Sequence, residues 1–124
     1  MNSNYRILLV DDDRIIRHMI RVYMERMGYQ VDLADNGKDA ITKYTETEYD
    51  LIIMDVRMPV MDGLEATKRI REIEEDHKRD KVKIVAVTAS EHKEVCLQSG
   101  MNDYFHKTTL ISHMKKMLSY VSTT

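Results

Sequence analysis

Apolar and polar residues follow two different periods along this chain, and the two periods alternate. Short apolar runs that stop at acidic or turn-forming residues are typical of strands buried in a parallel sheet. The runs that predict strands are Arg6–Val10, Gln30–Ala34, Leu51–Met54, Val82–Val87 and Asp103–His106. Gln30–Ala34 alternates weakly between apolar and polar residues, which places it nearer an edge of the sheet.

Between these runs, apolar residues recur at the spacing of a helix face. The first predicted helix begins at Arg14 and ends at Gly28, and the third begins at Asp62, where Glu65 gives capping-box spacing. The third helix leads into the charge-dense stretch Glu74–Lys81, which we expect to be a solvated helix end and loop. The other predicted helices are Lys38–Thr47, about Glu91–Ser99 and Leu110–Val121. Strands that alternate with helices in this way predict an α/β fold, a doubly wound five-stranded parallel sheet with five helices.

Size, composition and charge narrow the class of protein. A chain of 124 residues with 43% hydrophobic and 32% charged residues fits one domain over residues 1–124. The net charge of −2 gives no basic field for nucleic acid or an anionic membrane. No apolar run approaches the ~20 residues that span a bilayer. The single cysteine, Cys96, cannot form an internal disulfide, so a cytoplasmic location is expected.

Acidic side chains follow two of the predicted strands. Asp11 and Asp12 follow the first strand, and Asp55 ends the third. Because ligands of open α/β sheets lie beyond the carboxyl ends of the strands, we expect these three carboxylates to meet in one cleft. Clustered carboxylates repel one another and need a cation, and an all-oxygen ligand set with bound water suits Mg²⁺ or Mn²⁺.

Two further polar residues follow the fourth and fifth strands. Thr88 offers a hydroxyl donor and Lys107 an ammonium group at the same edge of the sheet. A carboxylate surrounded by a metal, an ammonium and a hydroxyl is suited to phosphoryl transfer. In that reaction Asp55 is the in-line nucleophile, while the cation and Lys107 neutralise the charge of the transferred group.

Taken together, these segments resemble the receiver domain of two-component response regulators. The residues that carry the resemblance are Leu8–Asp12, Met54–Gly63, Val87–Ala89 and Lys107, within a match from about Tyr5 to Tyr120. The set in this order is specific, although each piece alone is weak. The resemblance implies a flavodoxin-like sheet with strand order 2-1-3-4-5.

The resemblance also implies a role for each residue of the cleft. Asp55 would accept a phosphoryl group from a phosphohistidine of a sensor histidine kinase or a histidine phosphotransfer protein. Asp12 would bind Mg²⁺ directly, Asp11 mostly through water, and the backbone carbonyl of Arg57 would be a further ligand. Lys107 would pair with the phosphoryl oxygens. The domain would then hydrolyse the phosphoryl group slowly, without turnover of free substrates.

A conformational switch is the implied output. Thr88 would turn inward to hydrogen-bond the phosphoryl group, and Tyr104 would follow it from an outward to an inward rotamer. That coupling moves the surface of the fourth helix, fifth strand and fifth helix, which faces an unknown downstream protein. The stretches Gly63–Thr67 and Gly100–Tyr104 are similar to receivers of hybrid kinases and phosphorelays. A monomer or weak dimer is expected. The chain ends soon after the fifth predicted helix, so we expect that it either acts without an attached output domain or was cut from a larger protein.

The chain departs from the family pattern at two places. Thr108 stands where the family usually has a proline joined to the lysine by a cis peptide bond. Because a non-proline cis bond costs about 3–4 kcal/mol, we expect either a trans bond with a shifted loop or a strained cis bond. The segment between Thr88 and Tyr104 is also shorter than usual. Because the fourth helix lies in this segment, the sequence supports phosphorylation more strongly than it supports output through that helix.

Two other functions and several structural roles are alternatives for these residues. A Mg²⁺-dependent phosphohydrolase with an aspartate nucleophile usually has a second acid two positions later, where this chain has Arg57. A pseudo-receiver that acts only as an interaction module would lack part of the acid set or the lysine, and this chain has both. Asp13 and Asp62 are expected to be helix caps, as is Ser90. His106 precedes the active lysine, but a single histidine is not a metal site.

Overall fold

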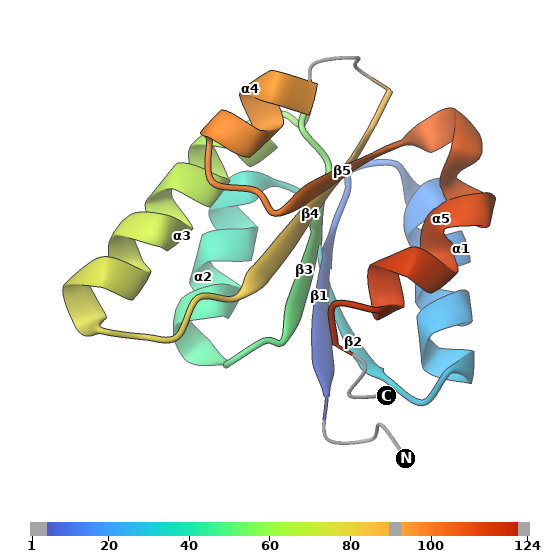
Figure 1. The fold of residues 1–124 in the computed structure, drawn as a ribbon, viewed down its shortest axis with the longest axis horizontal. Coiled ribbons are helices and arrows are strands. Elements are labelled where there is room, and N and C mark those ends of the chain that lie inside the picture. Colours follow the sequence, from blue (N-terminus) through green and yellow to red (C-terminus); the bar gives the residue numbers. More distant parts are fainter. Residues whose placement is uncertain (1–4, 90–92, 122–124) are drawn as a thin grey trace.

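The computed structural model describes residues 5–89 and 93–121 and shows a sheet between two layers of helices (Figure 1). The described strands are β1 (Arg6–Val10), β2 (Gln30–Ala34), β3 (Leu51–Met54), β4 (Lys83–Thr88) and β5 (Asp103–His106). All four pairings are parallel, in the order β2-β1-β3-β4-β5. The predicted fold and strand order are confirmed. β4 begins and ends one residue later than predicted.

Helices cover both faces of this sheet. They are α1 (Arg14–Arg26), α2 (Gly37–Glu46), α3 (Gly63–His77), α4 (Lys93–Gln98), the short 3₁₀ helix η1 (Lys107–Thr109) and α5 (Leu110–Leu118). In Figure 1, α2, α3 and α4 lie on one side of the sheet, and α1 and α5 lie on the other. The last helix ends before the predicted Val121, although Val121 itself is buried. The predicted start of the fourth helix at Glu91, and the predicted cap Ser90, fall outside the described residues.

The central strands are apolar on both faces because helices cover both. Leu8, Ile52 and Ile84 belong to the apolar cluster on the side of α2, α3 and α4. Ile7 and Ile53 belong to the second cluster, on the side of α1 and α5. This two-sided burial explains why the strands appear in the sequence as continuous apolar runs.

Side-chain caps begin the helices that follow the acidic strand ends. Asp13 accepts hydrogen bonds from the backbone N–H groups of Ile15 and Ile16 at 3.0 and 3.2 Å. Asp62 accepts one from the backbone N–H of Glu65 at 2.8 Å. Both predicted caps are therefore confirmed, and these two carboxylates satisfy donors that the helix itself leaves unpaired.

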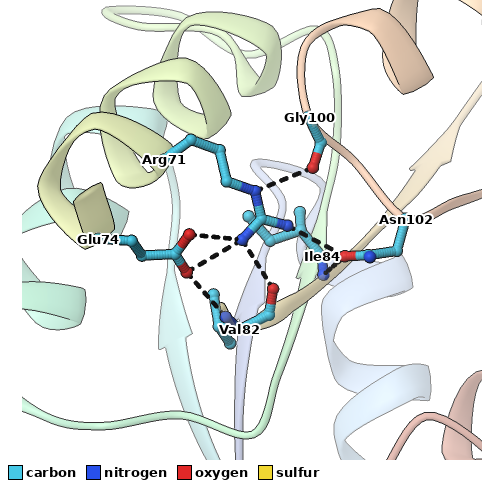
Figure 2. A network of polar contacts seen from close by, with 6 residues as sticks. All are labelled: Arg71, Glu74, Val82, Ile84, Gly100 and Asn102. Carbon is cyan, nitrogen blue, oxygen red and sulfur yellow. Dashed lines mark hydrogen bonds and ion pairs between the residues drawn. The ribbon is translucent and has the colours of Figure 1, made fainter. Parts of the chain in front are cut away.

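A network of polar contacts between Arg71 and the buried Glu74 holds the start of β4 (Figure 2). Arg71 of α3 donates to both oxygens of Glu74 at 2.8 and 3.0 Å and to the carbonyl of Val82 at 2.8 Å. It also reaches the carbonyl of Gly100 and the side chain of Asn102, both at 3.0 Å. The expectation that the stretch from Glu74 is solvated is wrong for Glu74 itself, which is 3% exposed. The reason is this set of partners, which replaces water around the carboxylate.

No helix in the described parts of the chain is long and apolar enough to cross a membrane.

Candidate functional site

The predicted cleft forms where β1, β3 and β5 end. Asp11 follows β1 directly, and its backbone N–H donates to the carbonyl of Ala34 at 3.1 Å. Asp55 follows β3, and its backbone N–H donates to the carbonyl of Val10 at 2.9 Å. These bonds continue the sheet by one residue beyond the strands, so both acids are held on the rigid frame of the sheet.

The three acids predicted to bind a metal lie together. One carboxylate oxygen from each of Asp11, Asp12 and Asp55 lies within 4.8 Å of the other two. Asp11 and Asp55 are 1% and 4% exposed, whereas Asp12 is exposed to solvent. Hard oxygen donors with one side open to water fit Mg²⁺, which keeps several of its waters when bound. The residues present therefore suit the predicted ion.

Lys107 points into the same cleft. Its Nζ lies 3.1 Å from Oδ2 of Asp55 and 3.2 Å from Oδ2 of Asp11. The peptide bond between Lys107 and Thr108 is trans, because the described residues contain no cis peptide. Of the two geometries expected from the missing proline, the structure therefore has the trans bond, and η1 forms the loop at this point.

Burial and neighbouring charges shift the pKa values of Asp11, Asp55 and Lys107. Burial raises the pKa of Asp11 from 3.8 to about 6, despite a hydrogen bond from the backbone N–H of Asp13 that favours the charged form. Burial also raises the pKa of Asp55, although Lys107 opposes the shift. Burial lowers the pKa of Lys107, but the two carboxylates outweigh it and raise that pKa overall. One ammonium thus faces two buried acids. The cleft therefore carries more negative than positive charge, and an added cation would be stabilised there.

The two predicted switch residues lie on β4 and β5. Thr88 is 1% exposed, ends β4 and pairs in register with His106. Tyr104 pairs with Ala86 and packs, partly buried, against the apolar cluster on the side of α2, α3 and α4. The structure places Thr88 at the carboxyl edge and Tyr104 two residues further back. Their roles as a switch stay predictions.

Arg57 lies in the turn after Asp55. The carboxylate of Asp55 accepts hydrogen bonds from the backbone N–H groups of Val56 and Arg57, which orient it. The Arg57 side chain is exposed and, with Asp12 and Met58, lines an open groove of about 660 Å³ beside the acids. The role of the Arg57 carbonyl as a metal ligand stays a prediction.

Two features that support the site were not predicted from the sequence. A Cβ atom added to Gly63 would lie 2.0 Å from the carbonyl oxygen of Asp55, so only glycine lets α3 begin this close to the strand end. Arg17 of α1 donates to the carbonyl of Asp11 at 2.9 Å. The Asp62–Gly63 pair suggested a turn, but the close approach depends on where α3 lies on the sheet. Nothing local in the sequence indicates the partner of Arg17.

The fold and the site define a class of protein. It is a doubly wound α/β protein whose parallel strands end at two buried acids, one exposed acid and a lysine. The sequence profile of the response regulator receiver domain matches residues 7–119. The chain belongs to this family, and the resemblance drawn from its motifs is confirmed.

Individual relatives agree with this assignment. Transcriptional regulatory protein ResD of Bacillus subtilis is 36% identical over 96% of this chain and 50% of ResD. The receiver domain of Ssk1 from Saccharomyces cerevisiae, solved with the histidine phosphotransfer protein Ypd1, has a TM-score of 0.85 and 31% identity, covering 97% of this chain and 90% of that one. Response regulator TrrA of Thermotoga maritima, solved with Mg²⁺ and BeF, has a TM-score of 0.81 and 33% identity, covering 95% and 99%.

The chain spans half or less of its curated relatives. It covers 50% of ResD and between 5 and 15% of several histidine kinases from plants and Dictyostelium discoideum.

Proposed function

We propose that this chain is a phosphoacceptor switch in which Asp55 takes up a phosphoryl group in the presence of Mg²⁺. The observation that carries the proposal is the position of the Lys107 ammonium, 3.1 Å from Asp55 within a cluster of three acids. Membership of the receiver family supports the same reading. Asp11, Asp12 and the carbonyl of Arg57 are the proposed metal ligands beside Asp55.

The proposed reaction moves one phosphoryl group between two proteins. An oxygen of Asp55 attacks the phosphorus of a phosphohistidine, the P–N bond breaks, and the released imidazole takes up a proton. Lys107 stabilises the charge on the phosphoryl oxygens, and the backbone N–H groups of Val56 and Arg57 hold the carboxylate. Bound Mg²⁺ would neutralise further negative charge in the cleft. In the slow loss of the activated state, water attacks the phosphorus and releases inorganic phosphate and the free carboxylate.

The proposed partner is a sensor histidine kinase or a histidine phosphotransfer protein. Support comes from the similarity to the Ssk1 receiver, which was solved with Ypd1. We further propose that residues 1–124 form one receiver domain with its core at about 5–120, working in the cytoplasm. The free thiol of Cys96 suits a reducing compartment.

The proposed output runs through Thr88 and Tyr104 to the surface of α4, β5 and α5. Thr88 is at the edge that would receive the phosphoryl group, and Tyr104 follows on the neighbouring strand. At the far end of β5, the Tyr120 hydroxyl donates to Asp103 at 2.5 Å and joins the end of the chain after α5 to this strand. A change at β5 would therefore be passed to the α5 side of the surface.

Intact mass after treatment with acetyl phosphate and Mg²⁺ tests this proposal. The wild type should gain the mass of one phosphoryl group, and Asp55→Ala should gain none. A wild type that gains no mass would favour a pseudo-receiver. Turnover of free phosphomonoesters should be assayed alongside, because rapid turnover would instead favour a phosphohydrolase.

A further inference from the structure

The loop that carries Lys107 begins with an unusual helix cap. The backbone N–H of Thr108 donates to Nδ1 of His106 at 3.2 Å, and the hydroxyl of Thr108 lies 2.8 Å from the same nitrogen. The hydroxyl of Thr109 donates to the backbone carbonyl of His106 at 3.2 Å. His106 is thus the cap residue of η1, a position where serine, threonine, asparagine and aspartate are usual.

This cap requires one tautomer of the imidazole. The N–H of Thr108 can donate to Nδ1 only when that nitrogen carries no proton, so in the capped loop the ring proton is on Nε2. The hydroxyl of Thr108 can then donate to Nδ1 as well. The imidazole satisfies a backbone donor that the first turn of η1 would otherwise leave without a partner.

Lys107 lies between two fixed points because of this cap. On one side, His106 is held in the sheet by its register with Thr88 of β4. On the other side, the capped η1 sets the direction in which the chain leaves the strand. Thr108 has no ring to fix its backbone, unlike a proline. The lysine stem is flexible and does not by itself hold the ammonium in one place. A fixed backbone narrows the positions that the ammonium can take and so keeps it near Asp55.

We propose that His106 is a positioning residue, whose imidazole fixes the η1 loop so that the Lys107 ammonium meets the phosphoryl group on Asp55. The inference rests on the proposed phosphoacceptor function and adds a residue to it. His106 does not contact the phosphoryl group. It acts through the backbone of Lys107 and Thr108.

Two substitutions at His106 separate the cap from the bulk of the ring. The variant His106→Asn places an amide oxygen near the position of Nδ1, so it should keep the hydrogen bond from Thr108. His106→Phe keeps a ring but has no acceptor. With phosphoramidate as donor and Mg²⁺ present, the initial rate of phosphorylation, followed by intact mass, should fall about tenfold in His106→Phe, because small misplacements of a catalytic group are costly. His106→Asn should stay within about twofold of the wild type.

A double-mutant cycle tests whether the effect passes through the lysine. In a Lys107→Met background the ammonium is absent, so adding His106→Phe should slow phosphorylation no further. Thr109→Val is the matched control, because it removes a hydrogen bond of the same loop and leaves the imidazole cap in place. It should phosphorylate at the wild-type rate. If His106→Phe fails to fold, His106→Ala removes the acceptor without added bulk.

The outcomes are distinguishable. Equal rates for His106→Phe and the wild type would overturn the inference, as would equal slowing by His106→Asn and His106→Phe. A further loss in the Lys107→Met background would overturn it too, because the effect would then not pass through the lysine. A wild type that takes up no phosphoryl group would instead overturn the proposed function itself.

Discussion

Glu74, beside the start of β4, and Asp55, just beyond the end of β3, are both almost fully buried carboxylates, at 3% and 4% exposure. Glu74 accepts two hydrogen bonds from the guanidinium of Arg71 and one from the backbone N–H of Val82 (Figure 2). Asp55 shares one ammonium with the equally buried Asp11. The acid that supports packing is matched by one opposite charge, and the acids of the cleft are left with negative charge in excess.

This difference explains which region can respond to a ligand. A paired and hydrogen-bonded carboxylate gains nothing from an added cation, because its oxygens already have donors. The acids of the cleft gain from any positive charge that enters. A buried carboxylate thus stabilises the packing at one end of the sheet, at Glu74, and can respond to a cation at the other end, in the cleft.

The largest expected effect is at the Arg71–Glu74 ion pair. Arg71→Met removes the guanidinium and leaves Glu74 buried without its charge partner, so the free energy of unfolding should fall by about 3–5 kcal/mol. Urea unfolding at pH 7 measures this loss. Arg71→Met with Glu74→Leu should recover only the part of the loss that comes from the unpaired charge. The carbonyls of Val82 and Gly100 and the N–H of Val82 still lose their side-chain partners in this double variant.

Arg69→Met is the matched control on the same helix. Arg69 pairs with Glu65 at 2.9 Å, but both side chains are about half exposed, so the pair is solvated. The unfolding curve of this variant should differ little from the wild type. Equal losses in Arg69→Met and Arg71→Met would show that the buried network does not differ from a surface ion pair.

Local sequence signals explain why one of these regions was predicted and the other was not. Asp11, Asp12 and Asp55 each follow an apolar run, and parallel strand ends meet at one edge, so their convergence could be deduced. Glu74 lies in a charge-rich stretch that looks solvated. Glu74 accepts from the backbone N–H of Val82, and its partner Arg71 is itself held by Gly100 and Asn102, which are distant in sequence. The fold followed from periodicity, whereas the partners of single charges depend on tertiary packing.

The loop after β5 shows the same limit. The missing proline at Thr108 left two peptide geometries open, and the structure has the trans form together with the cap of His106, which no periodicity reveals. The lysine itself was predicted because its position after the last strand is a matter of topology. Side-chain caps between neighbours need the backbone first, since they depend on its local angles.

The next largest effect is the pH dependence of stability at Asp11, which shares the single ammonium of Lys107 with Asp55. Because the pKa of Asp11 rises from 3.8 to about 6 on folding, its protonated form favours the fold, and that stability is lost as pH rises through about 6. Asp11→Asn stays neutral. Its stability relative to the wild type, measured by urea unfolding in EDTA, should therefore increase by roughly 1–3 kcal/mol between pH 4 and pH 7. A constant difference across this range would contradict an excess of charge in the cleft.

Glu74→Gln supplies the contrasting arm of that experiment. It weakens a charge-assisted pair, so this variant should be less stable than the wild type at pH 7. The two neutralising substitutions, at Asp11 and at Glu74, should therefore act in opposite directions at neutral pH.

The third prediction is a gain in stability from the cation. At ten times its dissociation constant, Mg²⁺ should raise the free energy of unfolding by about 1.4 kcal/mol, because it binds the folded state alone. Asp12→Asn should remove this gain, and Arg71→Met should keep it, since Arg71 is remote from the acids. Melting curves in Mg²⁺ and in EDTA measure the effect. Identical curves for the wild type would contradict the proposed metal site.

The smallest expected effect is at Asp55 itself. Burial raises the pKa of Asp55, so the neutral side chain is favoured in the fold, and Asp55→Asn should stabilise the metal-free protein at pH 7. The amide can still accept a hydrogen bond from Lys107, and Lys107 keeps Asp11 as its ion partner at 3.2 Å. Thermal melts in EDTA measure the gain. If Asp55→Asn were instead less stable than the wild type, the charge of Asp55 would stabilise the fold as that of Glu74 does. The two regions would then not differ in the way described.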